Sequence, residues 1–225
     1  MTLPSRPGIS ALAMFLLLAM SANPGRTQTK NIGIFTDESS VGQTPPGCKA
    51  SYDPKTGEYR ITGGGANVWD TTDAFYFIWK RVSGDLELSA DVQFLGASEA
   101  EHRKAMLMVR GTLDPSSAYA DAVSHGNGLT SLQFRGVAGE QTYQVFQQIE
   151  GKARLRLVRE GSRYTMFAGR PGEELKPSGP VEYVRLADPV YVGIGVCSHV
   201  ATTLETAVFS NVKLEMKPPP AAPAK

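Results

Sequence analysis

The chain has 225 residues, of which 41% are hydrophobic and 20% are charged, and its formal net charge at pH 7 is +1. A chain of this length is sufficient for one domain with a full core. The near-neutral charge lacks the basic excess with which proteins attract nucleic acid, so no nucleic-acid partner is expected.

The N-terminal segment 1–22 has the pattern of a signal peptide. Arg6 precedes the largely apolar run 9–19, and small residues follow that run. The alternative is a membrane anchor, but the run is shorter than the roughly 20 residues needed to span a bilayer. We therefore predict cleavage between Ser21 and Gln28, which leaves a periplasmic or extracellular mature chain with no membrane span and takes its formal charge to zero.

Period-2 alternation of apolar and polar residues recurs through the rest of the chain, in short runs bounded by Gly, Pro, Asp, Asn and Ser. This pattern is typical of β-strands, and helical periodicity is almost absent. From Leu86 onward in residues 85–94, for example, every second residue is apolar, so one face packs and the other is polar. We expect strands at 58–62, 74–82, 85–94, 104–111, 118–124, 129–136, 142–149, 153–159, 163–169, 181–186, 189–198 and 203–215.

About twelve short strands with tight turns predict an all-β sandwich or barrel. We assign this domain to residues 31–216. The Pro/Ala-rich segment 217–225 is expected to be a disordered tail, because proline lacks the backbone donor that a sheet requires.

Antiparallel strands reverse direction at each turn, so counting strands indicates which loops share one end of the sandwich. With residues 86–94 taken as running upward, Trp69, His102, His125 and His199 all fall in loops at the upper end. These loops are longer than the turns at the lower end. Because long loops on a rigid scaffold commonly carry function, we expect the functional site at this end.

Alternation also indicates which side chains point away from the core between the sheets. The residues taken as inward-facing are Leu107, Val109, Leu132, Phe134, Val145, Leu155 and Leu157. The outward-facing set is then Met106, Met108, Arg110, Tyr119, Asp121, Ser131, Gln133, Arg135, Gln144, Phe146, Gln148, Arg154 and Arg156. We expect Arg110, Asp121, Gln133 and Arg135 to form the polar centre of a site, because planar hydrogen-bonding groups suit polar ligands such as sugars. One of the two arginines is expected to neutralise Asp121. The alternative is an ordinary solvated sheet face.

Six blocks of the sequence are similar to a known family. They are TGGGANVW (62–69), DAFYFIWK (73–80), HRKA (102–105), YADA (119–122), HGNGLTSLQFR (125–135) and YVGIGVCSH (191–199). They resemble an exported bacterial domain family of uncharacterised function in the concanavalin A-like lectin/glucanase superfamily, often found beside TolB-like propellers. The resemblance covers residues 37–214 and implies a jelly-roll sandwich of two antiparallel curved sheets. It implies no single activity, because that superfamily includes lectins, glycosidases and adhesion modules.

The resemblance also implies that the first and last strands meet in one sheet, which would bring Cys48 and Cys197 together. An exported protein enters an oxidising compartment in which such a pair forms a disulfide. The alternative is two isolated thiols.

The catalytic and metal patterns are weak. A glycosidase needs two carboxylates about 5 to 10 Å apart, whereas Glu87 and Asp91 on one predicted strand are separated by about 13 Å. The three histidines lack the close spacing of zinc ligands. Calcium at the upper loops, near Asp70 and Asp73, is the one cofactor alternative.

The sequence therefore predicts an exported binding module for carbohydrate or another polar ligand of the cell envelope, with a glycan or a cell-envelope protein as partner. A structural or protein-interaction domain with no small ligand and a glycoside hydrolase remain as alternatives. Exposure of Trp69, Tyr119 and Phe146 would favour glycan binding, and their burial would favour the structural domain. The ligand-binding candidates are Trp69, Arg110, Tyr119, Asp121, His125, Gln133, Arg135 and His199.

Overall fold

The computed structural model describes Met1 and residues 32–149, 151–177, 179 and 182–218. Apart from Met1, the predicted signal peptide lies outside these residues, as do residues 219–225 of the tail. Every regular element within them is a strand. Among the described residues there is accordingly no helix with the length and hydropathy to span a membrane.

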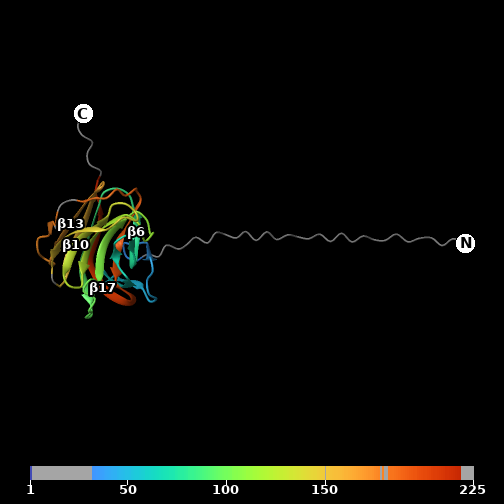
Figure 1. Ribbon diagram of the computed structural model, residues 1–225, viewed down its shortest axis with the longest axis horizontal. Coiled ribbons are helices and arrows are strands. Elements are labelled where there is room, and N and C mark those ends of the chain that lie inside the picture. The colour runs from blue at the N-terminus through green and yellow to red at the C-terminus, as the bar shows by residue number, and fades with distance from the viewer. Residues whose placement is uncertain (2–31, 150, 178, 180–181, 219–225) are drawn as a thin grey trace, which may run out of the picture.

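The strands form two large antiparallel sheets, which confirms the predicted all-β sandwich. In Figure 1 the labels β6 and β10 mark the first sheet, and the labels β13 and β17 mark the second. The first sheet has seven strands, in the order β1 (Asp37–Val41), β6 (Phe75–Val82), β16 (Val190–Cys197), β8 (Lys104–Arg110), β9 (Tyr119–His125), β10 (Leu129–Arg135) and β11 (Tyr143–Gln148).

The second sheet has eight strands, and β17 at its centre contains two register shifts, between Val200 and Leu204 and between Ser210 and Lys213. Its order is β14 (Lys176–Pro177), β13 (Arg163–Gly169), β12 (Ala153–Glu160), β7 (Leu86–Leu95), β17 (Val200–Met216), β3 (Glu58–Gly65) and β2 (Lys49–Asp53), with β15 (Glu182–Tyr183) paired to β13. A separate hairpin consists of β4 (Val68–Trp69) and β5 (Thr72–Asp73).

The main core lies between the two sheets. Leu107, Val109 and Leu132 of the seven-stranded sheet belong to the same buried cluster as Leu155 and Leu157 of the eight-stranded sheet. The two other residues taken as inward-facing, on β10 and β11, are half-buried and pack against this cluster. The alternation therefore predicted the inward face of both sheets correctly.

The opposite face of the seven-stranded sheet carries a second buried cluster, so the interpretation of that face as exposed was wrong. The cluster contains Met106, Met108, Tyr119 and Val123, and Val68 of the β4–β5 hairpin packs with them. The physical reason is that the hairpin and the loops that follow β8 and β10 fold back over this face. Its members are Val41, Val68, Phe75, Phe77, Met106, Met108, Tyr119, Val123 and Cys197, with Trp79, Leu113 and Tyr191 at its margin.

Two glycines of β16 make room for aromatic rings on this covered face. A Cβ atom at Gly195 would lie 3.0 Å from Cδ2 of Phe75, and one at Gly193 would lie 2.9 Å from Cε2 of Phe77. At both positions the added atom would lie nearer still to a backbone carbonyl of β6, that of Tyr76 or of Ile78, so any larger side chain would displace the neighbouring strand as well as a ring.

The predicted polar face also divides between the two sheets. Arg154 and Arg156 lie on β12 of the eight-stranded sheet, where Arg154 pairs with Asp91 at 3.0 Å and Arg156 lies over the ring of Phe167. These two arginines therefore belong to a different surface from Arg110 and the rest of the predicted set.

Both cysteines are free thiols, which corrects the predicted disulfide. Cys48 precedes β2 of the eight-stranded sheet and packs against the main core, whereas Cys197 ends β16 of the other sheet and lies in the second cluster. Their thiols donate instead to nearby carbonyls, Cys48 to Pro45 and Cys197 to Gly65, each at 3.4 Å. The two side chains thus occupy different layers of the molecule.

Candidate functional site

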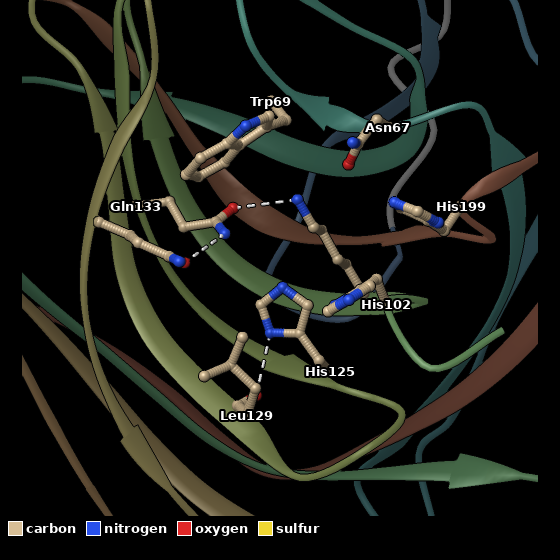
Figure 2. A pocket seen from close by; sticks show the side chains of 9 residues that line it. Asn67, Trp69, His102, His125, Leu129, Gln133 and His199 are labelled. Atoms are coloured by element: carbon tan, nitrogen blue, oxygen red, sulfur yellow. Dashed lines mark hydrogen bonds between the residues drawn. The ribbon is translucent and has the colours of Figure 1, made fainter.

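A pocket of about 190 Å³ lies at the loop end of the covered face (Figure 2). Trp69 and Asn67 stand on one side of it, and His102 and His125 on the other (Figure 2). The strand counting predicted that Trp69 and the three histidines share one end, and the structure confirms this. The lining residues are Asn67, Trp69, His102, Lys104, His125, Leu129, Gln133, Gln144 and His199.

Lys104, the first residue of β8, is buried at the base of the pocket. Its Nζ donates to the carbonyl oxygen of Val68 at 2.6 Å and to Oε1 of Gln133 at 3.3 Å, and it lies 5.4 Å from the centre of the Trp69 ring. Burial lowers the pKa of the Lys104 amine, although nearby acidic groups oppose this shift. No carboxylate of the described residues forms an ion pair with it.

Two glutamines extend the hydrogen bonding from Lys104 across the sheet. Gln133 on β10 and Gln144 on β11 lie directly opposite each other in the strand register. Gln133 accepts from Lys104 through Oε1 and donates through Nε2 to Oε1 of Gln144 at 3.3 Å. The Nε2 group of Gln144 is therefore left as a donor at the pocket wall.

His125 is fixed as a neutral imidazole. Its Nδ1 lies 2.9 Å from the carbonyl oxygen of Leu129, and because a carbonyl only accepts, Nδ1 carries the proton and Nε2 is an acceptor. Burial, and then the charge of Lys104, lower the pKa of His125 to about 3. This side chain therefore offers a hydrogen-bond acceptor to a ligand hydroxyl.

The other two histidines complete the loop side of the pocket. His102 is exposed, and its ring centre lies 5.9 Å from that of His125 and 5.4 Å from that of His199. His199 occupies the turn between β16 and β17 with a φ of 61°, a region that histidine enters more readily than most residues. Burial and the neighbouring Lys104 lower its pKa. Within the described residues, no group of three or more His, Cys, Asp or Glu side chains is arranged to hold a metal ion.

Asp121 lies on the same sheet face but is sealed from solvent. Asp121 lies on β9, opposite Met108 of β8 on one side and Gln133 of β10 on the other, and it is fully buried. Neither carboxylate oxygen has a hydrogen bond of good geometry among the described residues, although the backbone N–H of Gln133 acts on the carboxylate and opposes the rise of its pKa. Burial raises the pKa of Asp121 well above its usual range, and the charge of Lys104 only partly opposes this.

The two predicted arginines pair with Asp73 and not with Asp121, which corrects the expected charge pairing. Arg135 binds Asp73 at 2.7 Å, and Arg110 approaches the same carboxylate at 3.4 Å, with all three side chains fully buried. Arg110 and Arg135 flank Tyr119, which is two residues along β9 from Asp121 and therefore about 6 to 7 Å from it. The β4–β5 hairpin brings Asp73 to them. We call Asp73, Arg110 and Arg135 the arginine cluster.

Arg135 also ties the surrounding loops to the sheet. Its guanidinium donates to the carbonyl oxygens of Trp69, Asp70, Pro115, Ser117 and Glu140, at 3.1 to 3.3 Å. These acceptors come from three separate loops. The arginine cluster therefore holds the hairpin that carries Trp69 over the sheet, and it lies outside the pocket lining.

The predicted ligand-binding residues thus separate into two groups. Trp69, His125, Gln133 and His199 line the pocket. Arg110, Tyr119, Asp121 and Arg135 are fully buried beside or beneath it. Sequence reasoning did not single out Asn67, Lys104 and Gln144 as site residues. Extending the alternation of Met106 and Met108 by one step would have placed Lys104 on the same face.

Comparison with known proteins shows the fold. No family model matches the sequence, and no curated protein matches it significantly. Among solved structures, the chain is similar to the GH43 protein BlXynB from Bacillus licheniformis, with 13% identity and a TM-score of 0.59 over 84% of this chain and 39% of that one.

Two further solved structures match along nearly their whole length. The carbohydrate-binding module CBM66 from Bacillus subtilis has 13% identity and a TM-score of 0.50, over 81% of this chain and 97% of that one. The β-glucanase from Bacillus licheniformis has 8% identity and a TM-score of 0.51, over 85% of this chain and 96% of that one. At these identities the likeness shows the fold alone.

These likenesses and the sheet order define the class of protein: a two-sheet jelly-roll β-sandwich, as the sequence predicted. The chain has a sandwich fold that a carbohydrate-binding module and a β-glucanase also have. The narrower resemblance, to an exported family of uncharacterised function, stays a prediction.

Proposed function

We propose that the protein is an exported carbohydrate-binding module that holds one small sugar unit in the pocket at its loop end. The observation that carries this proposal is the lining of the pocket, in which Trp69 faces a set of fixed polar groups. An aromatic ring packs against the apolar face of a sugar, while amide, imidazole and amine groups bond its hydroxyls.

The size of the pocket favours a single sugar unit. Its volume of about 190 Å³ is below the range of roughly 300 to 1,000 Å³ that is common for drug-sized ligands. His125 supplies an acceptor, and Gln144 and Lys104 supply donors, so the ligand hydroxyls meet both kinds of partner. Export by the predicted signal peptide would bring this module to the cell envelope.

Binding is favoured over hydrolysis because the described lining of the pocket contains no carboxylic acid. None of its described lining residues is Asp or Glu, whereas a glycosidase needs a pair of carboxylates beside the scissile bond. Asp121 is the nearest acid on the same face, and it is buried without access to a substrate.

A protein-interaction role is the second candidate. Tyr143 and Phe146 lie on the edge strand β11 and are 61% and 64% exposed. Of the three aromatic residues that the sequence offered as discriminators, Tyr119 is buried, Trp69 is partly exposed and Phe146 is exposed. The exposed Phe146 is outside the pocket, so it suits a protein contact as well as a glycan contact.

The test is glycan-array screening of the mature chain, followed by isothermal titration with the sugars that bind. We expect Trp69→Ala to weaken binding at least about tenfold, because an aromatic face worth about 1.5 kcal/mol beyond its buried area is lost. Tyr143→Ala is the matched control, since it removes an exposed aromatic residue from outside the pocket. Equal weakening by both variants, or binding that neither affects, would contradict the proposed site.

A further inference from the structure

Lys104 is a buried cation whose charge the described residues leave without an ion pair. Its side chain is 3% exposed, and its two hydrogen-bond acceptors, the carbonyl of Val68 and the amide oxygen of Gln133, are both neutral. A buried charge is costly unless it is paired. Arg110 and Arg135, on the same sheet face, have such a partner in Asp73.

The surroundings of Lys104 do not supply the missing charge. The pocket lining consists of neutral amides, imidazoles, Trp69 and Leu129, with no carboxylate. Asp121 is close enough to influence Lys104 but makes no ion pair with it, and burial favours the neutral form of that acid. The thiol of Cys197 opposes the lowering of the Lys104 pKa more than any carboxylate does, but burial raises the pKa of that thiol itself to about 11, so it is neutral at pH 7; Asp73 and Asp70 act on Lys104 more weakly than Asp121 does.

We propose that the pocket takes a sugar acid, a single sugar unit whose carboxylate forms the ion pair that Lys104 lacks. This inference rests on the proposed function and names its ligand class. The ammonium group has three donors, of which the structure uses two, so one N–H is left for the carboxylate. A charge-assisted hydrogen bond at a buried site is stronger than one between neutral groups.

The number of charges favours a carboxylate over a phosphate ester. A phosphate ester carries a charge of about −1.5 to −2 at pH 7, and proteins commonly bind it with several cations. Lys104 is the one lysine or arginine in the described lining of the pocket. A carboxylate carries one negative charge and matches it.

The ligand would also strengthen the charged form of Lys104. Burial lowers the pKa of this amine, and an anion bound beside it would raise the pKa again. His102 and His199 face the same volume, and their N–H groups can donate to a second oxygen of the ligand.

The experiment compares matched ligands by isothermal titration with the mature protein at pH 7. The pairs are methyl glucuronide against methyl glucoside and galacturonate against galactose. Glucose 6-phosphate is included to test whether a phosphate ester binds instead. We expect each acid to bind about ten- to a hundredfold more tightly than its neutral partner, as one charge-assisted hydrogen bond implies. Glucose 6-phosphate should bind no better than the neutral sugar.

Lys104→Met should abolish the preference for the acid over the neutral sugar, and Lys55→Met, at an exposed turn, is the control that should keep this preference. The ratio in the wild-type protein tests the inference even if Lys104→Met fails to fold. Equal binding of acid and neutral sugar would overturn the inference and leave the proposed function standing. Tighter binding of glucose 6-phosphate than of either acid would have the same consequence. Absence of binding to every glycan on the array would overturn both.

Discussion

Two charged regions lie on the same face of the seven-stranded sheet and differ in how their polar groups are satisfied. In the arginine cluster, Asp73 is shared by Arg110 and Arg135, and Arg135 bonds five loop carbonyls as well. At the pocket, Lys104 has no ion pair among the described residues, and the carboxylate of Asp121 has no hydrogen bond of good geometry there. Lys104 and Asp121 are as deeply buried as the three residues of the arginine cluster, so solvent exposure does not explain the difference.

The comparison separates a structural role from the proposed binding role. A buried network whose members are all paired rigidifies the fold, whereas an unpaired buried charge reduces stability. The arginine cluster fixes the hairpin that carries Trp69, and the pocket uses that rigid position. Three substitutions test this division.

The largest effect is expected from Arg135→Met in the arginine cluster. It leaves Asp73 buried with only the longer contact to Arg110 and removes the donor to the carbonyl of Trp69. We expect the free energy of unfolding to fall by about 3 to 5 kcal/mol, as measured by urea denaturation. Arg163→Met, at an exposed position, is the control and should change stability by no more than about 0.5 kcal/mol. A loss below about 1 kcal/mol at Arg135 would remove the structural role.

A pH effect of intermediate size is expected from His125→Asn. The pKa of His125 is lowered from 6.5 in the unfolded chain to about 3 in the folded protein, so the unfolded state takes up the proton first as pH falls. The contribution of His125 to stability is therefore complete above pH 6.5 and declines as pH falls toward 3.

Asparagine does not titrate, and its side-chain amide can keep the bond to the carbonyl of Leu129. Between pH 7.5 and pH 5 the wild-type protein should therefore lose about 2 kcal/mol relative to this variant, in denaturation curves measured at each pH. Parallel curves for the two proteins would show that His125 is not held in its neutral form.

The smallest effect, and one of opposite sign, is expected from Asp121→Asn. Burial disfavours the ionised carboxylate of Asp121 in the folded protein and so raises its pKa, whereas the unfolded chain keeps the same group ionised in water. At neutral pH this difference lowers the free energy of unfolding. A neutral amide of the same shape should raise the free energy of unfolding by about 1 kcal/mol. Asp73→Asn is the paired control and should destabilise, since two arginines then lose their carboxylate. Destabilisation by both variants would mean that Asp121 is paired in solution.

The alternation of residues predicted much of the fold because it is a local property of the chain. Successive side chains of a strand point to opposite faces, so Leu107 and Val109 were assigned to the core correctly from their spacing alone. Strand direction reverses at each turn, and this rule brought Trp69 and the three histidines together at one end. Both inferences need only neighbouring residues and the order of the strands.

The tertiary structure decided which distant segments meet, and no local pattern carries that information. The pairing of Arg135 with Asp73, 62 residues earlier in the chain, depends on the β4–β5 hairpin folding over the sheet face. The same covering turned a face that was expected to present its polar residues to a ligand into a second buried cluster, and it left Lys104 inside a pocket. A charge selects its partner within a few ångströms, so side chains that alternation places correctly on one face acquire their roles only from the segment that closes over them.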